Sequence, residues 1–165
     1  MLFKTQPASA GLNIIIVGCG KVGSTLVERL TGEGHDVTII DENAERIQEL
    51  ADYYDVMGIV GNGASHSIQE EAGIQNAHLF IAVTESDELN LLCCIIAKQD
   101  GDCSTIARIR TPDYIKDSAY LREKLGCWSA RWRSWIAKWR RRPTSRGCAR
   151  TSACRNSTSK TTIWT

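Results

Sequence analysis

The chain has 165 residues, enough for one domain with a substantial core and too few for two large ones. Its net charge of +1 hides an uneven distribution: residues 1–126 hold 10 Lys or Arg against all 19 Asp and Glu, hence −9, whereas residues 127–165 hold 10 basic residues and no acidic one. No stretch approaches the roughly 18 consecutive apolar residues that a membrane-spanning helix needs, so we expect a cytoplasmic protein.

The seven cysteines are scattered along the chain and form no C-x-x-C pair. No histidine lies at a metal-ligand spacing from any of them. An odd number of unclustered cysteines is typical of reduced thiols and argues against a disulfide framework or a structural metal site.

Residues 13–125 alternate regularly between strand and helix patterns. Short β-branched runs bounded by glycine or turn residues predict strands at 13–17, 36–40, 56–60, 78–83 and 104–109. Apolar residues at helical spacing predict helices at 21–34, 43–54, 64–73, 86–99 and 112–126. Asn43 and either Ser86 or Asp87 are the expected N-caps of the second and fourth helices.

Five strand–helix repeats joined by short loops favour an α/β fold. Parallel strands need helical crossovers, and right-handed crossovers place helices on both faces of the sheet. We therefore expect a doubly wound, Rossmann-like parallel sheet of five strands in a single domain over residues 12–126. An irregular basic tail, residues 127–165, follows it.

A glycine-rich turn lies where the first strand hands over to the first helix. Gly18, Gly20 and Gly23 fit Gly-x-Gly-x-x-Gly, in which the first glycine allows a tight turn, the second admits a pyrophosphate and the third lets helix and strand pack closely. Backbone N–H groups at the helix start then favour phosphates. The candidate binding residues of this turn are Gly18, Cys19, Gly20, Lys21, Val22 and Gly23.

An acidic residue follows the second strand at the distance that this motif requires. Asp41 lies 18 residues after Gly23, close to the roughly 20 expected for the acid that bonds the adenine ribose. A carboxylate there repels a 2′-phosphate, so NAD(H) is expected over NADP(H). The alternative is that Asp41 merely caps the helix that begins near Asn43. Glu42 is its neighbour in the candidate site.

Two further loops are expected at the same rim, because ligands of open parallel sheets lie beyond the carboxyl ends of the strands. Gly61, Asn62 and Gly63 follow the third strand and would lie beside an adenine. Thr84 follows the fourth strand, where the second half of a dinucleotide would lie. Ordinary turn chemistry is the alternative explanation for each of these residues.

At these residues the sequence resembles the N-terminal nucleotide-binding domain of the TrkA family, also called the KTN or RCK N-terminal domain. The matching segments occur in family order over about residues 12–125. They are "IIIVGCGKVGSTLVERL", "DVTIIDENAERIQEL", "VGNGAS", "AHLFIAVTESDELNLLCCIIAK" and "IARIRTPDY". The last segment is the most diagnostic, because ordinary dehydrogenases have no such requirement after the fifth strand.

The resemblance implies regulation of ion transport and no catalysis. Family members bind NAD(H) or ATP/ADP, assemble as dimers or rings of dimers, and lie peripherally on the inner face of the cell membrane against a Trk/Ktr-type potassium translocator. By resemblance, Gly18, Gly20 and Gly23 hold the diphosphate and Asp41 the ribose. Lys21 would reach a terminal phosphate or a neighbouring subunit, or is simply solvated.

Arg108 and Arg110 alternate along the fifth strand and so share a face. One is expected to face the ligand or the acids at 85–88, the other a dimer contact, and a purely structural ion pair is the alternative. Of the three histidines only His66, after the third strand, is expected near the adenine, and none is placed for hydride chemistry. No catalytic constellation is visible, so we expect no enzyme; the alternative is a fragment of an NAD-dependent oxidoreductase without its catalytic domain.

The tail has a composition unlike that of the domain. Residues 127–165 contain all five tryptophans, no acidic residue and almost no aliphatic ones, so no sixth strand is expected and the fifth strand would be an open edge. We interpret the tail as disordered or as an out-of-frame translation. A basic arm for nucleic acid or an anionic membrane is the alternative, although no nucleic-acid partner is expected for the domain.

Overall fold

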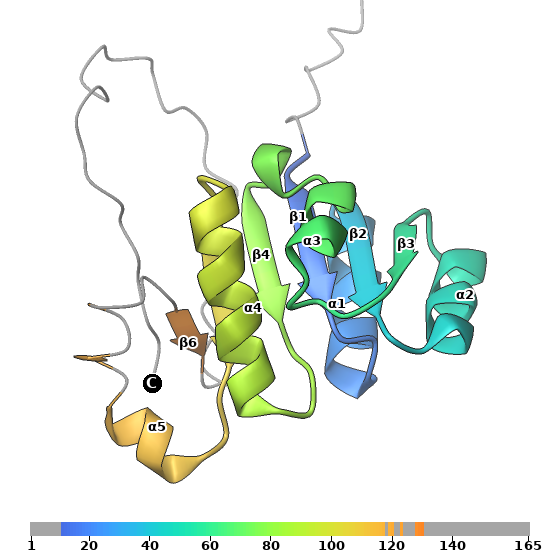
Figure 1. The fold of residues 1–165 in the computed structure, drawn as a ribbon. Helices are drawn as coiled ribbons and strands as arrows, with labels where there is room; N and C mark the ends of the chain where they lie inside the picture. Colours follow the sequence, from blue (N-terminus) through green and yellow to red (C-terminus); the bar gives the residue numbers. More distant parts are fainter. Residues whose placement is uncertain (1–10, 118, 121–122, 124–127, 131–165) are drawn as a thin grey trace, which may run out of the picture.

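The computed structural model describes residues 11–117, 119–120, 123 and 128–130 (Figure 1). The strands are β1 (Asn13–Val17), β2 (Asp36–Asp41), β3 (Met57–Val60), β4 (Leu79–Ala82), β5 (Ser104–Arg108) and β6 (Trp128–Ala130). The helices are α1 (Lys21–Gly32), α2 (Ala44–Tyr53), α3 (His66–Glu71), the 3₁₀ turn η1 (Ile74–Asn76), α4 (Asp87–Asp100) and α5 (Pro112–Lys116). Every strand and helix predicted within residues 13–117 is therefore present, although α5 ends at Lys116, before the predicted end of the fifth helix at 126.

All the described strands belong to one parallel sheet, in the order β3-β2-β1-β4-β5-β6. The order reverses direction between β1 and β4, so the chain winds outward first to one side and then to the other. This is the doubly wound arrangement that the strand–helix repeats predict. In Figure 1 the strand arrows run the same way, which brings their carboxyl ends to one edge of the sheet.

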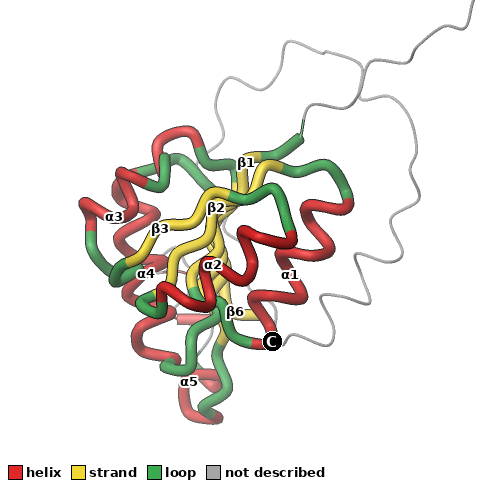
Figure 2. Tube along the Cα trace, turned by 90° about the vertical axis from the view of Figure 1, so that its right-hand side faces the viewer, coloured by secondary structure: helices red, strands yellow, loops and turns green. Residues whose placement is uncertain are grey.

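Helices cover both faces of the sheet, and each face has its own core. Ile14 and Ile16 of β1 pack with α1 and α2, whereas Ile15 and Val17 pack with α3 and α4. This alternation follows from the two-residue period of a strand, and it explains why β1 is apolar at every position after Asn13. Figure 2 shows the strands between α1 and α2 on one side and α3 and α4 on the other.

The predicted N-caps are those that the structure uses. The Asn43 side chain accepts hydrogen bonds from the backbone N–H groups of Glu45 and Arg46, at 2.9 and 3.2 Å. The Ser86 hydroxyl accepts one from Leu89, at 3.1 Å. Each side chain satisfies backbone donors that the first helical turn leaves without partners.

The expectation that no sixth strand follows residue 126 is wrong. Residues Trp128–Ala130 form β6, which pairs in parallel with Ile106–Arg108 of β5. A parallel ladder needs only backbone N–H and C=O groups, so an open sheet edge can pair with a segment that has no strand-like composition. The expectations for residues 131–165, as disordered, out-of-frame or a basic arm, concern residues outside those described.

Candidate functional site

A cavity of about 800 Å³ opens beyond the carboxyl ends of the strands, where the order of the sheet reverses between β1 and β4. Ten of the thirteen predicted site residues line it, at or just beyond the carboxyl ends of β1, β2, β3, β4 and β5. They are Gly18, Gly20, Lys21, Val22, Asp41, Glu42, Gly61, Gly63, Thr84 and Arg108. Cys19, Gly23 and Asn62 do not line the cavity and act behind it.

The glycine turn has the geometry that its sequence predicts. Gly18 has φ of +101°, a conformation that L side chains rarely adopt. A Cβ on Gly23 would collide with the carbonyl oxygen of Gly18, so this glycine lets α1 approach the turn. A Cβ on Gly20 would meet nothing within 4 Å, because Gly20 faces the open cavity. The space that a side chain would fill there is available to a ligand.

Helix α1 begins at this turn without a side-chain cap. Gly20 is its N-cap residue and provides no side-chain acceptor for the N–H groups of the first turn. Gly20, Lys21 and Val22 all line the cavity. Uncapped N–H groups, the positive end of the helix dipole and the Lys21 ammonium together suit a phosphate group.

Asp41 both braces the glycine turn and faces the cavity. Its Oδ2 accepts a hydrogen bond from the N–H of Cys19 at 2.6 Å, and its Oδ1 accepts one from the N–H of Asn43 at 2.9 Å. A carboxylate offers about four acceptor positions, so roughly two remain for ligand hydroxyls. The turn-capping alternative and the ribose-binding prediction are thus compatible, because the two functions use different lone pairs.

Cys19 is a structural residue in the turn. Its side chain is only 5% exposed, and burial together with the nearby Asp41 carboxylate raises the pKa of its thiol to about 12, against a smaller opposing effect of Arg46. The thiol therefore stays protonated at neutral pH and is a poor nucleophile. Its backbone N–H, not its sulfur, contributes to the site through Asp41.

The loop after β3 is held by side chains behind it. The Asn62 side chain accepts from the N–H of Ala64 at 2.8 Å and so closes the turn that presents Gly61 and Gly63 to the cavity. The fully buried Gln69 donates to the carbonyl of Gly63 at 2.7 Å and to that of Cys93 at 3.1 Å. Sequence reasoning missed Gln69, because nothing local distinguishes it from an exposed helical glutamine.

The loop after β4 is held in the same way by a buried asparagine. Asn90 accepts hydrogen bonds from the N–H and the hydroxyl of Thr84, at 2.8 and 2.7 Å, and donates to the carbonyl of Arg108 at 2.9 Å. Thr84 and Arg108, both predicted site residues, therefore share one support. Asn90 was not predicted; a polar residue on the apolar face of the fourth helix was the available signal.

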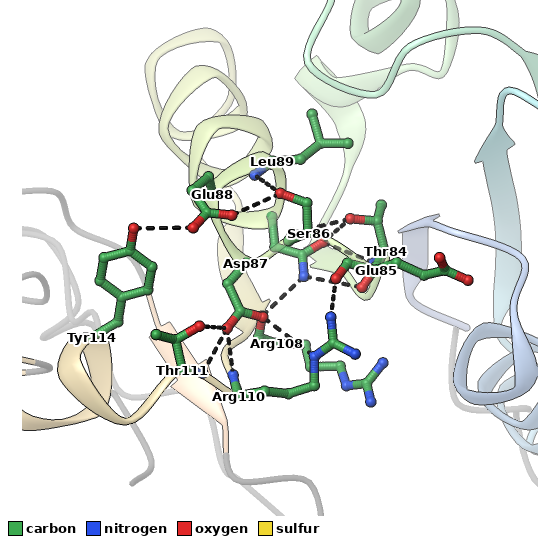
Figure 3. A network of polar contacts seen from close by, with 11 residues as sticks. Thr84, Glu85, Ser86, Asp87, Glu88, Leu89, Arg108, Arg110, Thr111 and Tyr114 are labelled. Atoms are coloured by element: carbon green, nitrogen blue, oxygen red, sulfur yellow. Dashed lines mark hydrogen bonds and ion pairs between the residues drawn. The ribbon is translucent and has the colours of Figure 1, made fainter.

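Figure 3 shows a polar network beside Thr84, in which Asp87 has the central position. Asp87 is 4% exposed, and its Oδ2 accepts from the N–H of Arg110 and from the N–H and hydroxyl of Thr111, at 2.7 to 2.8 Å. Burial alone would raise the pKa of this carboxyl, but these donors and the Arg110 charge outweigh it and hold the pKa below its usual value. Asp87 is therefore ionised at neutral pH.

Arg110 joins this network to the cavity. Its guanidinium donates to the backbone carbonyl of Glu85 and lies 3.5 Å from Asp87 Oδ1. Arg110 also lines the cavity, as do Arg108 and Glu85. The predicted pairing of one arginine with the acids at 85–88 is thus confirmed for Arg110, although β5 ends at Arg108 and Arg110 lies in the following loop.

Cationic side chains at several points of the cavity suit an anionic ligand. Lys21 and Arg46 contribute from the first turns of α1 and α2, Arg108 from the end of β5 and Arg110 from the loop that follows it. The sequence-based prediction did not include Arg46. Its position in the first helical turn after Asp41 could have indicated it. Asp41, Glu42 and Glu85 are the acidic lining residues. An elongated ligand with phosphates and hydroxyls fits this mixture better than a simple anion.

The three histidines lie outside the cavity. His35 and His78 accept hydrogen bonds through Nδ1 from the backbone N–H groups of Leu12 and Asn13, where the chain enters β1. His66, which the sequence places near an adenine, is bonded to Asp100 through Nδ1 at 2.6 Å and does not line the cavity. Among the described residues no group of His, Cys, Asp and Glu could hold a metal ion, and no helix could cross a membrane.

The fold and the position of the cavity define a Rossmann-like α/β domain with its site at the switch point of the sheet. The TrkA-N domain family matches residues 14–127, and the chain belongs to that family.

Curated relatives carry the same family name. The Trk system potassium uptake protein TrkA of Vibrio alginolyticus is 41% identical over 111 residues, which are 67% of this chain and 24% of that protein. A TrkA homolog of Pyrococcus horikoshii is 40% identical over 100 residues, 60% of this chain and 44% of that protein. The chain thus spans less than half the length of either relative.

Solved structures share the fold. The TrkA-N domain of the inner membrane protein ybaL from Escherichia coli superposes with a TM-score of 0.64 at 24% identity, covering 81% of this chain and 96% of that one. The GsuK channel bound to NAD gives 0.58 at 17%, over 70% and 21% of the two chains. The Kef C-terminal domain of Shewanella denitrificans in its AMP-bound form gives 0.59 at 18%, over 76% of each chain.

Proposed function

We propose that this domain binds an adenine nucleotide, NAD(H) or ATP/ADP, and thereby regulates a membrane potassium translocator of the Trk/Ktr type. The observation that carries the proposal is the combination of an open glycine turn with Asp41. Gly20 leaves room for a phosphate at the uncapped start of α1, and Asp41 keeps acceptor positions for ribose hydroxyls on the same wall of the cavity.

The lining residues form two groups, one at each end of the cavity. At one end, Asp41 and the loop with Gly61 and Gly63 receive the adenosine. At the other end, Thr84 and Arg108 meet the distal part of the ligand, a second ribose of NAD(H) or the terminal phosphates of ATP/ADP. The glycine turn with Lys21 spans the two ends and binds the phosphates between them.

A regulatory role fits these residues better than catalysis. NAD(H) supplies hydride chemistry only where a substrate and a general acid or base adjoin it. The histidines lie elsewhere, and the Cys19 thiol is protonated and buried. The relatives named TrkA, the GsuK channel bound to NAD and the AMP-bound Kef domain support a nucleotide-dependent role in potassium transport. The domain then acts as a homo-oligomer, peripheral to the cytoplasmic face of the membrane.

Calorimetric titration of the full chain with NADH, NAD, NADPH, ATP and ADP tests the proposal. Asp41→Asn removes the charge that favours ribose hydroxyls while keeping an acceptor for Cys19, and Glu49→Gln makes the same charge change at an exposed α2 position outside the cavity. We expect binding of NAD(H) or ATP/ADP, weaker binding of NADPH, and a selective loss in Asp41→Asn. No binding of any of these nucleotides would refute the proposal.

The regulatory half needs a transport measurement. Potassium flux through a Trk-type translocator in vesicles, measured with the chain added, should change when the bound nucleotide is exchanged. Flux that is the same with and without the chain, under every nucleotide that it binds, would contradict regulation and leave nucleotide binding intact.

A further inference from the structure

Three buried polar side chains lie directly behind the cavity, and none of them lines it. They are Gln69 on α3 and Asp87 and Asn90 on α4, with exposed fractions of 0, 4 and 0%. Buried polar groups are costly unless they are hydrogen-bonded, so their partners indicate what each group does. In all three cases the partners include backbone groups of the loops that form the cavity rim.

Asn90 connects the ends of two neighbouring strands. Its Oδ1 accepts both the N–H and the hydroxyl of Thr84 after β4, and its Nδ2 donates to the carbonyl of Arg108 at the end of β5. One side chain therefore sets the separation of the two residues that form the distal end of the cavity. Thr84 itself lies against the glycine turn, since a Cβ on Gly18 would be 3.0 Å from the Thr84 nitrogen.

Asp87 extends this support to the loop after β5. It receives three hydrogen bonds from Arg110 and Thr111, and Arg110 in turn donates to the carbonyl of Glu85 (Figure 3). The side chains of Asp87 and Asn90 lie one turn apart on α4. Together they tie the loops after β4 and β5 to the same helix turn.

Gln69 supports the opposite end of the cavity. It links the carbonyl of Gly63, in the loop after β3, to the carbonyl of Cys93 on α4. Its hydrogen bonds within the described part of the chain do not reach Thr84, Arg108 or Arg110. Among the described residues, the two ends of the cavity are thus held by separate buried hydrogen-bond sets that meet at the helix α4.

We propose that Asn90 and Asp87 are positioning residues for the distal end of the nucleotide site, and that they act independently of Gln69, which positions the adenosine end. The inference rests on the proposed function. Loops held in place before the ligand arrives lose less entropy on binding, so each hydrogen-bond set raises affinity only for the ligand parts that its loops contact. A ligand that ends at its first phosphate depends on Gln69, whereas one that reaches Thr84 and Arg108 depends on all three residues.

The test compares the dissociation constants of AMP, ADP and NADH for the full chain and its variants. Asn90→Ala is expected to raise the dissociation constant of NADH about tenfold, because one to two buried hydrogen bonds are lost. The dissociation constant of AMP should stay within about twofold. Gln69→Ala is the matched control: it removes a buried amide of the neighbouring helix and should weaken AMP, ADP and NADH by the same factor.

A milder variant covers the case in which Asn90→Ala fails to fold. Thr111→Val removes only the hydroxyl that donates to Asp87, at a half-exposed position outside the cavity. We expect it to weaken NADH by roughly threefold, with AMP unchanged. A selective effect in either variant supports the inference.

Uniform weakening would overturn the inference. If Asn90→Ala, or Thr111→Val where the former is unfolded, weakens AMP as much as NADH, or weakens neither, the residues do not position the distal end. The unmodified chain separates this failure from that of the proposed function. If it binds none of NADH, NAD, ATP and ADP, the proposed function fails and the inference with it; if it binds AMP and NADH, only the inference is at stake.

Discussion

The two sides of the cavity obtain their shape by different means. On the side of β1 and β2 the backbone itself sets the geometry: Gly18 takes a positive φ, Gly23 leaves room for a carbonyl, and the Asp41 carboxylate braces the turn. On the side of β4 and β5 the loops are ordinary backbone held by buried side chains, above all Asp87 and Asn90. The first side therefore depends on glycines, where no side chain is tolerated, and on one carboxylate. The second depends on hydrogen bonds from side chains that are buried behind the loops.

This difference determines what a substitution does on each side. Adding an atom to the glycine side creates a steric conflict that neighbouring backbone cannot relieve. Removing an atom from the β4–β5 side leaves a buried polar group without its partner, which costs less when the remaining groups can share donors. We therefore expect the largest loss of stability from the glycine side, and a loss that depends on pH from the other side.

Gly23→Ala should have the largest effect. Its new Cβ would collide with the Gly18 carbonyl oxygen, a backbone atom that cannot move away cheaply, so we expect a loss of about 3 kcal/mol or more of unfolding free energy. Urea denaturation followed by circular dichroism measures it. Gly32→Ala is the control within the same helix, because nothing lies within 4 Å of its new Cβ. That variant should be neutral or slightly stabilised. Equal stability of the two variants would show that the contact between Gly23 and the Gly18 carbonyl does not limit the size of residue 23.

Asp87→Asn tests the β4–β5 side. It should lower the free energy of unfolding by about 2 kcal/mol at neutral pH, because charge-assisted hydrogen bonds are lost. The pKa of Asp87 is lower in the folded chain than in the unfolded one, so its contribution is fully present above the ordinary carboxyl pKa near 4 and is lost as the pH falls through the lower folded value. Unfolding free energies measured from pH 7 to pH 3 should therefore converge for the variant and the unmodified chain. A difference that stays constant over this range would mean that the charge of Asp87 contributes nothing.

The same division explains what could be predicted from the sequence. The glycine spacing, Asp41 and the N-caps are local patterns, in which the residue type and its neighbours already imply the backbone conformation. The supports at Gln69 and Asn90 join residues that are 6 to 24 positions apart, and each looks like a common helical polar residue until the loops are in place. Cys19 was predicted as a binding residue, but it does not line the cavity, and its backbone N–H acts by holding Asp41. The sequence pattern does not distinguish a backbone role from a side-chain role.

The prediction that failed at the sheet edge has a similar physical cause. Side-chain patterns indicate which strands are buried, and a short edge strand such as β6 needs no such pattern to pair with β5. His66 follows the loop after β3 in the sequence, but its side chain pairs with Asp100 at the end of α4 and does not line the cavity. That pairing joins residues 34 positions apart, so no local pattern indicates it.

Asn43→Ala refines the comparison on the β2 side, because it removes a side-chain cap while leaving Asp41 in place. Asn43 accepts from two N–H groups of α2, and the loss of such a cap costs about 1 kcal/mol. Thermal unfolding should show a lower midpoint, and NADH affinity should change little, since Asp41 is bonded to the backbone of residue 43 and not to its side chain. A large loss of affinity would indicate that the α2 cap and the ribose site are one unit.

His66→Gln should have the smallest effect on stability. The comparison with Asp87 is useful because both side chains make polar contacts, but His66 is exposed and Asp87 is buried. The hydrogen bond that His66 donates to the Asp100 carboxylate, then the charges of Asp100 and Glu70, raise the pKa of His66, whose side chain is 61% exposed. A raised folded pKa contributes stability that is present below the ordinary value near 6.5 and lost as the pH rises through the folded value. Between pH 6 and pH 8 the thermal midpoint of the unmodified chain should therefore fall slightly relative to that of the variant. Solvent weakens exposed ion pairs, so this difference should be smaller than the acid effect at Asp87. A pH-dependent difference at His66 that equals or exceeds the one at Asp87 would show that burial does not strengthen the polar contacts on the β4–β5 side.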